Sequence, residues 1–266
     1  MIIDVVLPSM LCLITVATVL LHFRFQNRIK SLFQESEFRV RDAAFMVTSM
    51  GVMVTIMAFV PQQAIQILFL AAYSFILFLF IYVAVEKWYV AVLPSAAFVY
   101  LYLYWWNLVL LNIFAITFAI LVSLYLGGLF SWKTVAVFAV LVTVMDVVQV
   151  FGTGYMGASA EKMLQLQLPT LIIVPAFPAA LKGYLGLGLG DVFLAGLLCI
   201  QTAQKHGRKT GISAAASIGI VFFLFEIISL NYPLGRYFPA TVIVVGGWLT
   251  GLGFHHLLKF NRKQSS

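Results

Sequence analysis

Three acidic residues, Asp146, Asp191 and Glu226, lie inside long apolar stretches of the sequence. A charged side chain at the centre of a membrane-spanning helix costs about 2.5–3.5 kcal/mol on insertion scales, so such residues usually have a function. Two carboxyl groups that face each other in a poor dielectric cannot both ionise, and they hold one proton between them. The ionised member can take a proton from water while the protonated member polarises a peptide carbonyl. This chemistry is general acid–base hydrolysis without a metal or a covalent intermediate.

The composition indicates that lipid surrounds most of the chain. Of its 266 residues, 63% are apolar and 9% are charged, whereas a soluble domain has about 45–50% and about 25%. A soluble enzyme and a nucleic-acid binder are therefore excluded, although the net charge is +7. Cys12 and Cys199 lie in apolar runs, which excludes a disulfide framework. No HExxH motif occurs, so we expect no metal and no other cofactor. The first residues carry no basic flank, so we expect no cleavable signal peptide.

A helix that crosses a bilayer needs roughly 20 largely apolar residues. This length predicts an all-α polytopic membrane protein with nine transmembrane helices. The segment Trp105-Trp106-Asn107 divides the fourth span from the fifth, because tryptophans and an amide suit an interfacial turn. The expected spans are 5–23, 43–60, 64–85, 89–106, 109–130, 134–153, 184–204, 211–230 and 237–258.

The distribution of Lys and Arg predicts the orientation. Alternate connections place thirteen of the sixteen basic residues on one face of the membrane and leave Lys162, Lys182 and Arg236 on the other. The positive-inside rule then puts the N-terminus outside and the C-terminus in the cytoplasm. The basic face also predicts contact with anionic lipid. Its members are Arg24, Arg28, Lys30, Arg39, Arg41, Lys87, Lys133, Lys205, Arg208, Lys209, Lys259, Arg262 and Lys263.

Two of the acids match in depth. The sixth span runs outward and the seventh inward, and each places its aspartate about seven residues below the outer surface, which is roughly 10 Å at 1.5 Å per residue. Adjacent antiparallel helices would therefore set Asp146 and Asp191 level with each other. A proton or cation relay in a transporter uses the same residues, and a structural hydrogen-bonded pair is a third interpretation. Glu226 is interpreted as a buried, hydrogen-bonded or partly hydrated acid and not as a third catalytic group.

The residues before Asp191 are unusual. Gly186, Gly188 and Gly190 alternate with leucine directly before the acid, and glycine allows another backbone to approach closely. We expect a thin, deformable helix start here. Farther upstream, in the expected outer loop 154–183, residues 168–175 form an apolar, β-like run bracketed by prolines.

Several of these residues resemble a known family. Gly188-Leu189-Gly190-Asp191 is similar to the GxGD signature of intramembrane aspartyl proteases. The segment 146–153, Asp-Val-Val-Gln-Val-Phe-Gly-Thr, resembles the other catalytic segment of signal peptide peptidases, in which an aspartate precedes VFGT. Pro239-Ala240-Thr241 lies where that family carries PAL. The order of the motifs and their sixth, seventh and ninth spans agree with the presenilin and signal peptide peptidase family.

The resemblance implies a function and its site. Asp146 and Asp191 would be the catalytic residues, and Gly188, Leu189, Gly190, Pro239, Ala240 and Thr241 would shape the site and bind substrate. The substrates would be signal peptides or single-span, type II membrane proteins whose helix enters laterally. The expected orientation is that of signal peptide peptidase and is inverted relative to presenilin. The short chain resembles a microbial, archaeal-type member in a prokaryotic cell membrane, with a scaffold of five spans (1–130) and a catalytic part (131–266).

The sequence also departs from the family pattern. Met145 stands where the family has Tyr, Phe238 where Gln is common and Thr241 where PAL has Leu. Prepilin peptidases share GxGD but carry a Lys two residues after the Asp, where this chain has Phe193. The alternatives to a protease are a proton- or cation-coupled transporter that uses the same aspartates, and a non-catalytic binder of membrane helices.

Three further segments carry interpretations. Residues 169–175 and the backbone near Pro239 and Ala240 are predicted to pair with an unwound substrate strand, or residues 169–175 form a loop that rests on the membrane. Pro239 is also suited to a helix start. The aromatic residues at 98–106 are interpreted as an interfacial, lipid-facing belt. His255 and His256 are interpreted as residues at the boundary of the last span.

Overall fold

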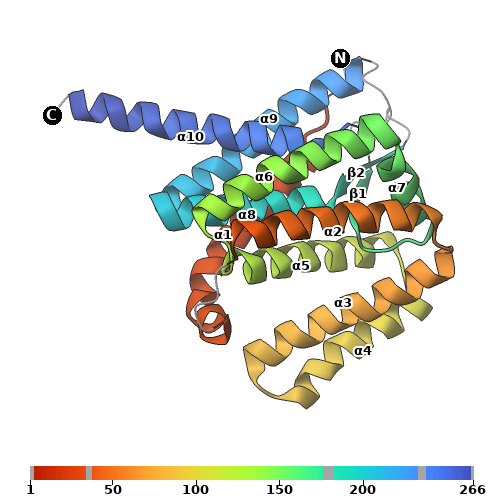
Figure 1. Ribbon diagram of the computed structural model, residues 1–266. Coiled ribbons are helices and arrows are strands. Elements are labelled where there is room, and N and C mark those ends of the chain that lie inside the picture. The colour runs from red at the N-terminus through yellow and green to blue at the C-terminus, as the bar shows by residue number, and fades with distance from the viewer. Residues whose placement is uncertain (1–2, 34–37, 176–182, 233–237, 265–266) are drawn as a thin grey trace.

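The structure is a computed structural model that describes residues 3–33, 38–175, 183–232 and 238–264. Most of the described residues are helical, and a two-stranded sheet lies between the seventh and eighth helices (Figure 1). The elements in chain order are α1 (Val6–Phe33), α2 (Val40–Phe59), α3 (Gln62–Val85), α4 (Trp88–Tyr104), α5 (Leu108–Gly127), α6 (Trp132–Val147), the π-helix η1 (Val148–Thr153), α7 (Tyr155–Gln165), β1 (Leu171–Pro175), β2 (Tyr184–Gly188), α8 (Leu189–His206), α9 (Arg208–Asn231) and α10 (Ala240–Gln264).

The chain is an integral membrane protein with a polytopic, helical fold. Among the described residues, seven helical segments are long and apolar enough to cross a membrane. Two helices that the sequence interpretation counts as spans are not among them. Helix α4 is apolar but has only 17 residues, and α8 has 18 residues and ends in the polar run Gln201–His206. The seven segments are Val6–Gln26, Val40–Phe59, Gln62–Val83, Leu108–Gly127, Trp132–Thr153, Arg208–Asn231 and Ala240–Leu257.

Helix α8 occupies the centre of the bundle. It packs against α1, α5, α6, α9 and α10, and every residue from Val192 to Ala203 is buried. Protein surrounds α8 on all sides, so its polar side chains find protein partners. The Nε2 atom of Gln201 donates to the carbonyl oxygens of Gly127 at 2.9 Å and Phe130 at 2.7 Å. Since those carbonyls follow the last turn of α5, Gln201 satisfies acceptors that the helix itself leaves open.

The α3–α4 hairpin lies at the periphery of the molecule (Figure 1). Its packing depends on aromatic rings, with Tyr73 of α3 stacked against Phe118 of α5 at 4.9 Å between ring centroids and tilted against Phe98 of α4 at 4.3 Å. Part of the predicted aromatic belt is therefore wrong, because Phe98 is fully buried and Tyr102 nearly so. Other members of the 98–106 segment, such as Tyr104 and Trp105, are exposed as expected for a lipid-facing surface.

The predicted break between the fourth and fifth spans is confirmed. Helix α4 ends at Tyr104 and α5 begins at Leu108. The side chain of Asn107 accepts a hydrogen bond from the backbone N–H of Leu110 at 3.0 Å. This N-cap satisfies one of the donors that a helix start leaves open, which explains why the chain turns at this amide.

The segment expected as the outer loop 154–183 contains more structure than predicted. It holds the helix α7 and the strand β1, which confirms the β-like run, and β1 pairs with β2 in antiparallel register with Ile173 opposite Gly186. The seventh span was predicted to begin near residue 184, and this is wrong because residues 184–188 form β2. Helix α7 is fastened to α2 by Lys162, whose Nζ donates to the carbonyl oxygens of Met57, Ala58 and Val60.

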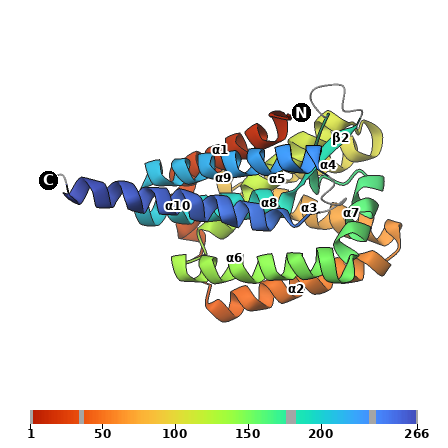
Figure 2. The ribbon, with the colours of Figure 1, turned by 90° about the horizontal axis from the view of Figure 1, so that it is seen from above.

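Most of the described basic residues gather at one end of the bundle. At this end the backbone N–H of Phe38, just before α2, donates to Leu129 O after α5 at 2.9 Å. His22 of α1 contacts Gln204 of α8 at 2.8 Å between Nε2 atoms. The sheet and α7 lie at the opposite end, where α1 begins, whereas α10 ends beyond the basic end (Figures 1 and 2). The two ends of the chain are thus on opposite sides of the bundle.

Candidate active site

Asp146 lies in the last turn of α6, directly before the helix changes its winding. Helix α6 ends at Val147 and continues as the π-helix η1 through Thr153. Such widened turns are rare and frequently occur at functional sites. The Asp146 side chain is buried, with 2% of its surface exposed. The segment 146–153 that carries the family resemblance is therefore also the segment with irregular backbone.

The first turn of α10 supplies a direct partner for this aspartate. Pro239 immediately precedes α10, which begins at Ala240, so the expected helix start at this proline is confirmed. The hydroxyl of Thr241 donates to Oδ2 of Asp146 at 2.7 Å. The other carboxyl oxygen, Oδ1, has no hydrogen-bond partner among the described residues. One oxygen of Asp146 is thus held in place and the other is left available.

Asp191 lies in the first turn of α8, whereas Asp146 lies in the last turn of α6. Gly188 is the N-cap residue and Asp191 is the third residue of the helix. A Cβ atom at position 188 would lie only 3.0 Å from Oδ2 of Asp191, so the carboxyl group turns back over the glycine. The expectation that Asp191 lies about two turns inside a helix is wrong, because β2 precedes it.

The two helices that carry the carboxyl groups, α6 and α8, lie side by side. Asp146 and Asp191 are close enough to interact electrostatically. The side nearest Gly190 is open, because a Cβ atom added there would meet no non-neighbouring atom of the described chain within 4 Å. Leu189 is buried and anchors the helix start. Three elements therefore build one acidic centre with an open face.

Metal chemistry has no support from the described side chains. No group of three or more His, Cys, Asp or Glu residues in that part of the chain is arranged to hold a metal ion. The two aspartates are thus a pair without a third ligand. His206, His255 and His256 form a cluster with ring centroids 5.6 to 6.1 Å apart, on α8 and α10 at the basic end of the bundle.

The β hairpin presents one free edge beside Asp191. Asn112 of α5 closes the outer edge of β1, because its Nδ2 donates to Ile173 O at 2.7 Å and its Oδ1 accepts from Ile173 N at 2.8 Å. In an antiparallel pair the backbone groups of directly opposite residues point the same way, either toward the partner strand or away from it. Gly186, opposite Ile173, therefore directs its N–H and C=O away from β1, as does Gly188. The described chain offers no partner to this edge of β2, and Gly186 is exposed.

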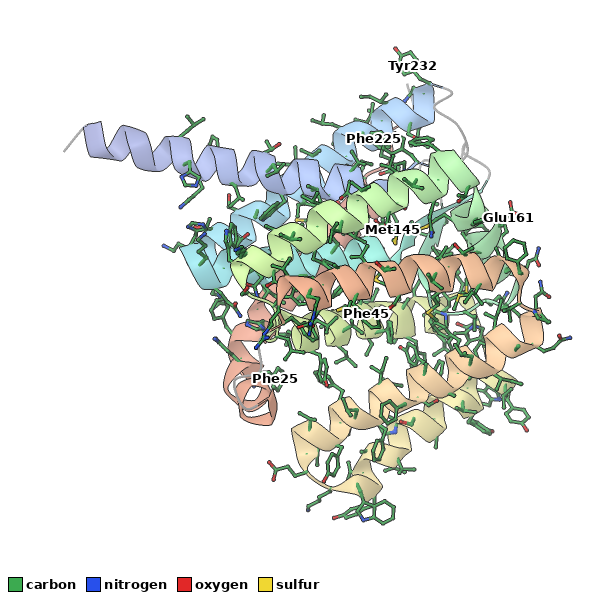
Figure 3. All side chains as sticks on the ribbon, in the orientation of Figure 1. Phe25, Phe45, Met145, Glu161, Phe225 and Tyr232 are labelled. Carbon is green, nitrogen blue, oxygen red and sulfur yellow. The ribbon has the colours of Figure 1, made fainter. Side chains whose placement is uncertain are left out.

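Phenylalanines connect the motifs around the site. Phe238, which precedes Pro239, packs against Phe225 of α9 at 4.5 Å and against Phe151 of η1 at 6.1 Å between ring centroids. These contacts hold the start of α10 against the π-helix and so help to keep Thr241 beside Asp146. Met145 points elsewhere. It lies against Gly51 of α2, where a Cβ atom would be 3.1 Å from the methionine sulfur (Figure 3).

A hollow of about 520 Å³ lies between α2 and α6. Met145, Val148 and Gln149 line it from the α6 side. Gln149 also ties the two helices together, since its Nε2 donates to Gly51 O at 2.8 Å. Neither aspartate lines this groove, so the groove flanks the segment 146–153 without including the acidic side chains.

Glu226, the third acid, lies in α9 and not beside the two aspartates. It is buried in α9, its Oε2 has no hydrogen-bond partner among the described residues, and it interacts electrostatically with Asp4. Asp4 is fully buried before α1 and accepts a hydrogen bond from Val6 N at 2.9 Å. The prediction that Glu226 is buried is confirmed. Its pairing with Asp4 was not anticipated, because Asp4 precedes the first span.

Two hydrogen-bonding roles near the acids are not predicted from the sequence. Thr241 was named only as a site-shaping residue, and a hydroxyl in the first turn of an apolar helix was the available signal for its hydrogen bond to Asp146. Asn112 was not singled out, although an amide inside an apolar run is such a signal as well. No protein-family model matches this chain, and no curated protein matches its sequence. The chemistry of the site is therefore inferred from its own atoms.

Proposed function

We propose that this protein is an intramembrane aspartyl protease that hydrolyses peptide bonds within transmembrane helices, in the manner of the presenilin and signal peptide peptidase family. The observation that carries the proposal is the pair of aspartates on adjoining helix termini, with Thr241 bonded to one of them. The motif resemblance of 146–153, 188–191 and 239–241 supports the same reaction. Each motif contributes a residue to one centre.

The mechanism uses the two carboxyl groups as acid and base. The ionised aspartate takes a proton from water as the water oxygen attacks the peptide carbonyl carbon, while the protonated aspartate gives its proton to the carbonyl oxygen. The resulting diol collapses when the aspartate that is now protonated delivers a proton to the amide nitrogen and the other, now ionised, takes a proton from a diol hydroxyl. The C–N bond then breaks, and a carboxylic acid and an amine are released. Thr241 orients Asp146 throughout, and Gly188 leaves room for the carboxyl group of Asp191.

The free edge of β2 is suited to hold the substrate. A peptide bond in a membrane helix is hydrogen-bonded within that helix and shielded from water, so the helix must open before hydrolysis. An extended peptide can replace those lost hydrogen bonds by pairing with an exposed strand edge. The edge at Gly186 and Gly188 leads directly to Asp191. Asn112 occupies the edge of β1, where residues 169–175 were predicted to pair with the substrate. We therefore assign the pairing with the substrate strand to β2.

The proposal includes nine crossings, with α4 and α8 counted beside the seven longer segments. The opposite placement of the chain ends fits an odd number of crossings (Figures 1 and 2). With the basic end in the cytoplasm, the aspartates lie toward the outer side of a prokaryotic membrane. Residues 1–130 then serve as the scaffold and 131–266 as the catalytic part, and the substrates are signal peptides or type II single-span proteins.

The test is cleavage of a panel of signal-peptide-like helices by the purified protein in detergent. Asp146→Asn and Asp191→Asn should each lower the rate by about 10²–10⁴-fold, as expected for loss of a general acid or base, and should leave thermal unfolding and gel filtration unchanged. Glu226→Gln is the matched control, because it neutralises a buried acid outside the site and should keep most of the activity. A transition-state analogue of aspartyl proteases should inhibit the wild type.

Two other functions have distinct outcomes in the same experiments. A transporter would take up a proton or cation into proteoliposomes, would lose uptake in both aspartate variants and would cleave no helix of the panel. A non-catalytic helix binder would bind the panel equally well after both aspartates were replaced. Either result would contradict the protease proposal, as would full cleavage by the Asp191→Asn variant.

A further inference from the structure

We propose that a hollow between α1 and α9, at the basic end of the bundle, binds the phosphate headgroup of an anionic membrane lipid. The hollow has a volume of about 420 Å³ and is lined by Leu20, Leu21, Phe23, Arg24 and Arg208. Its lining thus combines an apolar wall from α1 with one guanidinium group from each helix. The hollow is far from the acidic centre, and the inference does not depend on the proposed function.

The two exposed arginines on this hollow favour an anion between them. Guanidinium groups remain protonated at all relevant pH values, and two of them on one hollow repel each other. In the described part of the chain, neither Arg24 nor Arg208 forms an ion pair with a carboxylate. The planar guanidinium group matches two phosphate oxygens at once, and such bidentate bonds are among the strongest hydrogen bonds in proteins. A phosphate group therefore fits both the charge and the geometry of the lining.

The position of the hollow favours a lipid as the source of that phosphate. Arg24 lies near the end of the apolar segment Val6–Gln26, and Arg208 begins the segment Arg208–Asn231. The hollow is thus at a membrane boundary, and its apolar wall of Leu20 and Leu21 continues along α1 toward the membrane interior. A free phosphate would gain nothing from this wall, whereas an acyl chain would cover it. Anionic lipids are also attracted to clusters of basic residues beside a membrane.

The walls of the hollow are held in place by the core. His22 of α1 is buried and contacts Gln204, in the last turn of α8, at 2.8 Å. Gly207, at φ +92°, makes the turn between α8 and α9 in a conformation that favours glycine. This turn sets the direction in which Arg208 leaves the first turn of α9. The backbone that carries both arginines is therefore held in place, which limits the ordering cost of binding to their side chains.

The experiment measures lipid retention by the full-length protein. Native mass spectrometry in detergent, with added phosphatidylglycerol or phosphatidylcholine, should show preferential adducts of the anionic lipid on the wild type. The double variant Arg24→Gln/Arg208→Gln should lose at least tenfold in affinity for phosphatidylglycerol. The control Arg41→Gln/Lys133→Gln removes the same charge at the same end without touching the hollow, and it should bind as the wild type does.

Several outcomes decide the question. Equal losses in the two double variants would overturn the site, since binding would then follow net charge alone. Competition by millimolar inorganic phosphate as effective as that of the lipid would also overturn it, because the hollow would then be a free-anion site. If the double variant does not fold, the single variants Arg24→Lys and Arg208→Lys, which keep the charge but lose the planar fork, should still weaken binding severalfold. Wild-type affinity in both lysine variants would contradict the proposal.

Discussion

Helix α8 and the α3–α4 hairpin are both apolar and helical, yet they are stabilised in different ways. Every residue of α8 from Val192 to Ala203 is buried by other helices, whereas much of α3 and α4 faces outward, with Ile67, Phe75 and Leu93 more than 60% exposed. Because α8 is enclosed by protein, it tolerates polar residues that satisfy neighbouring carbonyls. The hairpin instead packs through contacts between aromatic rings. Its exposed apolar side chains face the lipid.

The comparison explains why the central helix is hard to recognise by hydropathy. A helix in contact with lipid must be apolar around its whole circumference, while one inside a protein bundle needs only partners for its polar groups. Helix α8, which carries Asp191, is therefore more polar than α3 and α4. Its length and composition do not mark it as a membrane span.

The largest effect on stability is expected for Gln201→Met in α8. Methionine keeps the length of the side chain but removes both hydrogen bonds to the carbonyls of Gly127 and Phe130. Two buried acceptors without a donor should cost about 2–4 kcal/mol, measured as a lower midpoint in thermal or denaturant unfolding in detergent. A change in the free energy of unfolding below about 0.5 kcal/mol would mean that water replaces the amide as the donor and that the centre of the bundle contains water.

The glycines of α10 allow a second, matched comparison. A Cβ atom at Gly247 would lie 2.7 Å from Ile218 Cα in the backbone of α9, whereas one at Gly246 would meet no non-neighbouring atom of the described chain within 4 Å. Gly247→Ala should therefore destabilise the protein by about 1–3 kcal/mol through overpacking.

Gly246→Ala is the control for that substitution. It should be neutral or stabilising by up to about 1 kcal/mol, because alanine favours a helix over glycine. The same unfolding measurement separates the two variants, and equal effects would show that α9 and α10 are less closely packed than the structure describes.

Thr241→Val should affect activity more than stability. Valine has nearly the shape of threonine but cannot donate to Asp146 Oδ2. Loss of one hydrogen bond to a catalytic carboxyl group should lower the cleavage rate about tenfold, which corresponds to about 1.4 kcal/mol. Thr241→Ser should restore most of the rate, and a fully active valine variant would exclude an orienting role for the hydroxyl.

The smallest effect is expected in the peripheral hairpin. Tyr73→Phe keeps the aromatic stacking but removes the hydrogen bond from the Tyr73 hydroxyl to Phe114 O. The cost should be about 1 kcal/mol of stability, with cleavage unchanged within a factor of two or so. A large loss of activity would mean that the hairpin is coupled to the acidic centre.

Local sequence signals predicted the parts of the molecule that depend on a few neighbouring residues. Hydropathy indicated the membrane class and most of the long helices, Asn107 indicated the break before α5, and the run ending at Pro175 indicated a strand. The predicted start of the seventh span failed because leucine and glycine alternate in residues 184–190. Hydropathy does not distinguish a buried strand followed by a helix from one long helix.

The sequence by itself determined that this chain belongs in a membrane and that it carries few acids there, because the transfer cost of each side chain depends only on its own chemistry. The tertiary structure decided which of those acids meet. The contact of Asp146 with Thr241 joins residues 95 positions apart, Asn112 closes β1 from another helix, and the acid that acts electrostatically on Glu226 is Asp4. Such contacts depend on how helices rotate and cross, and helix packing sets these angles through side chains from every neighbour at once.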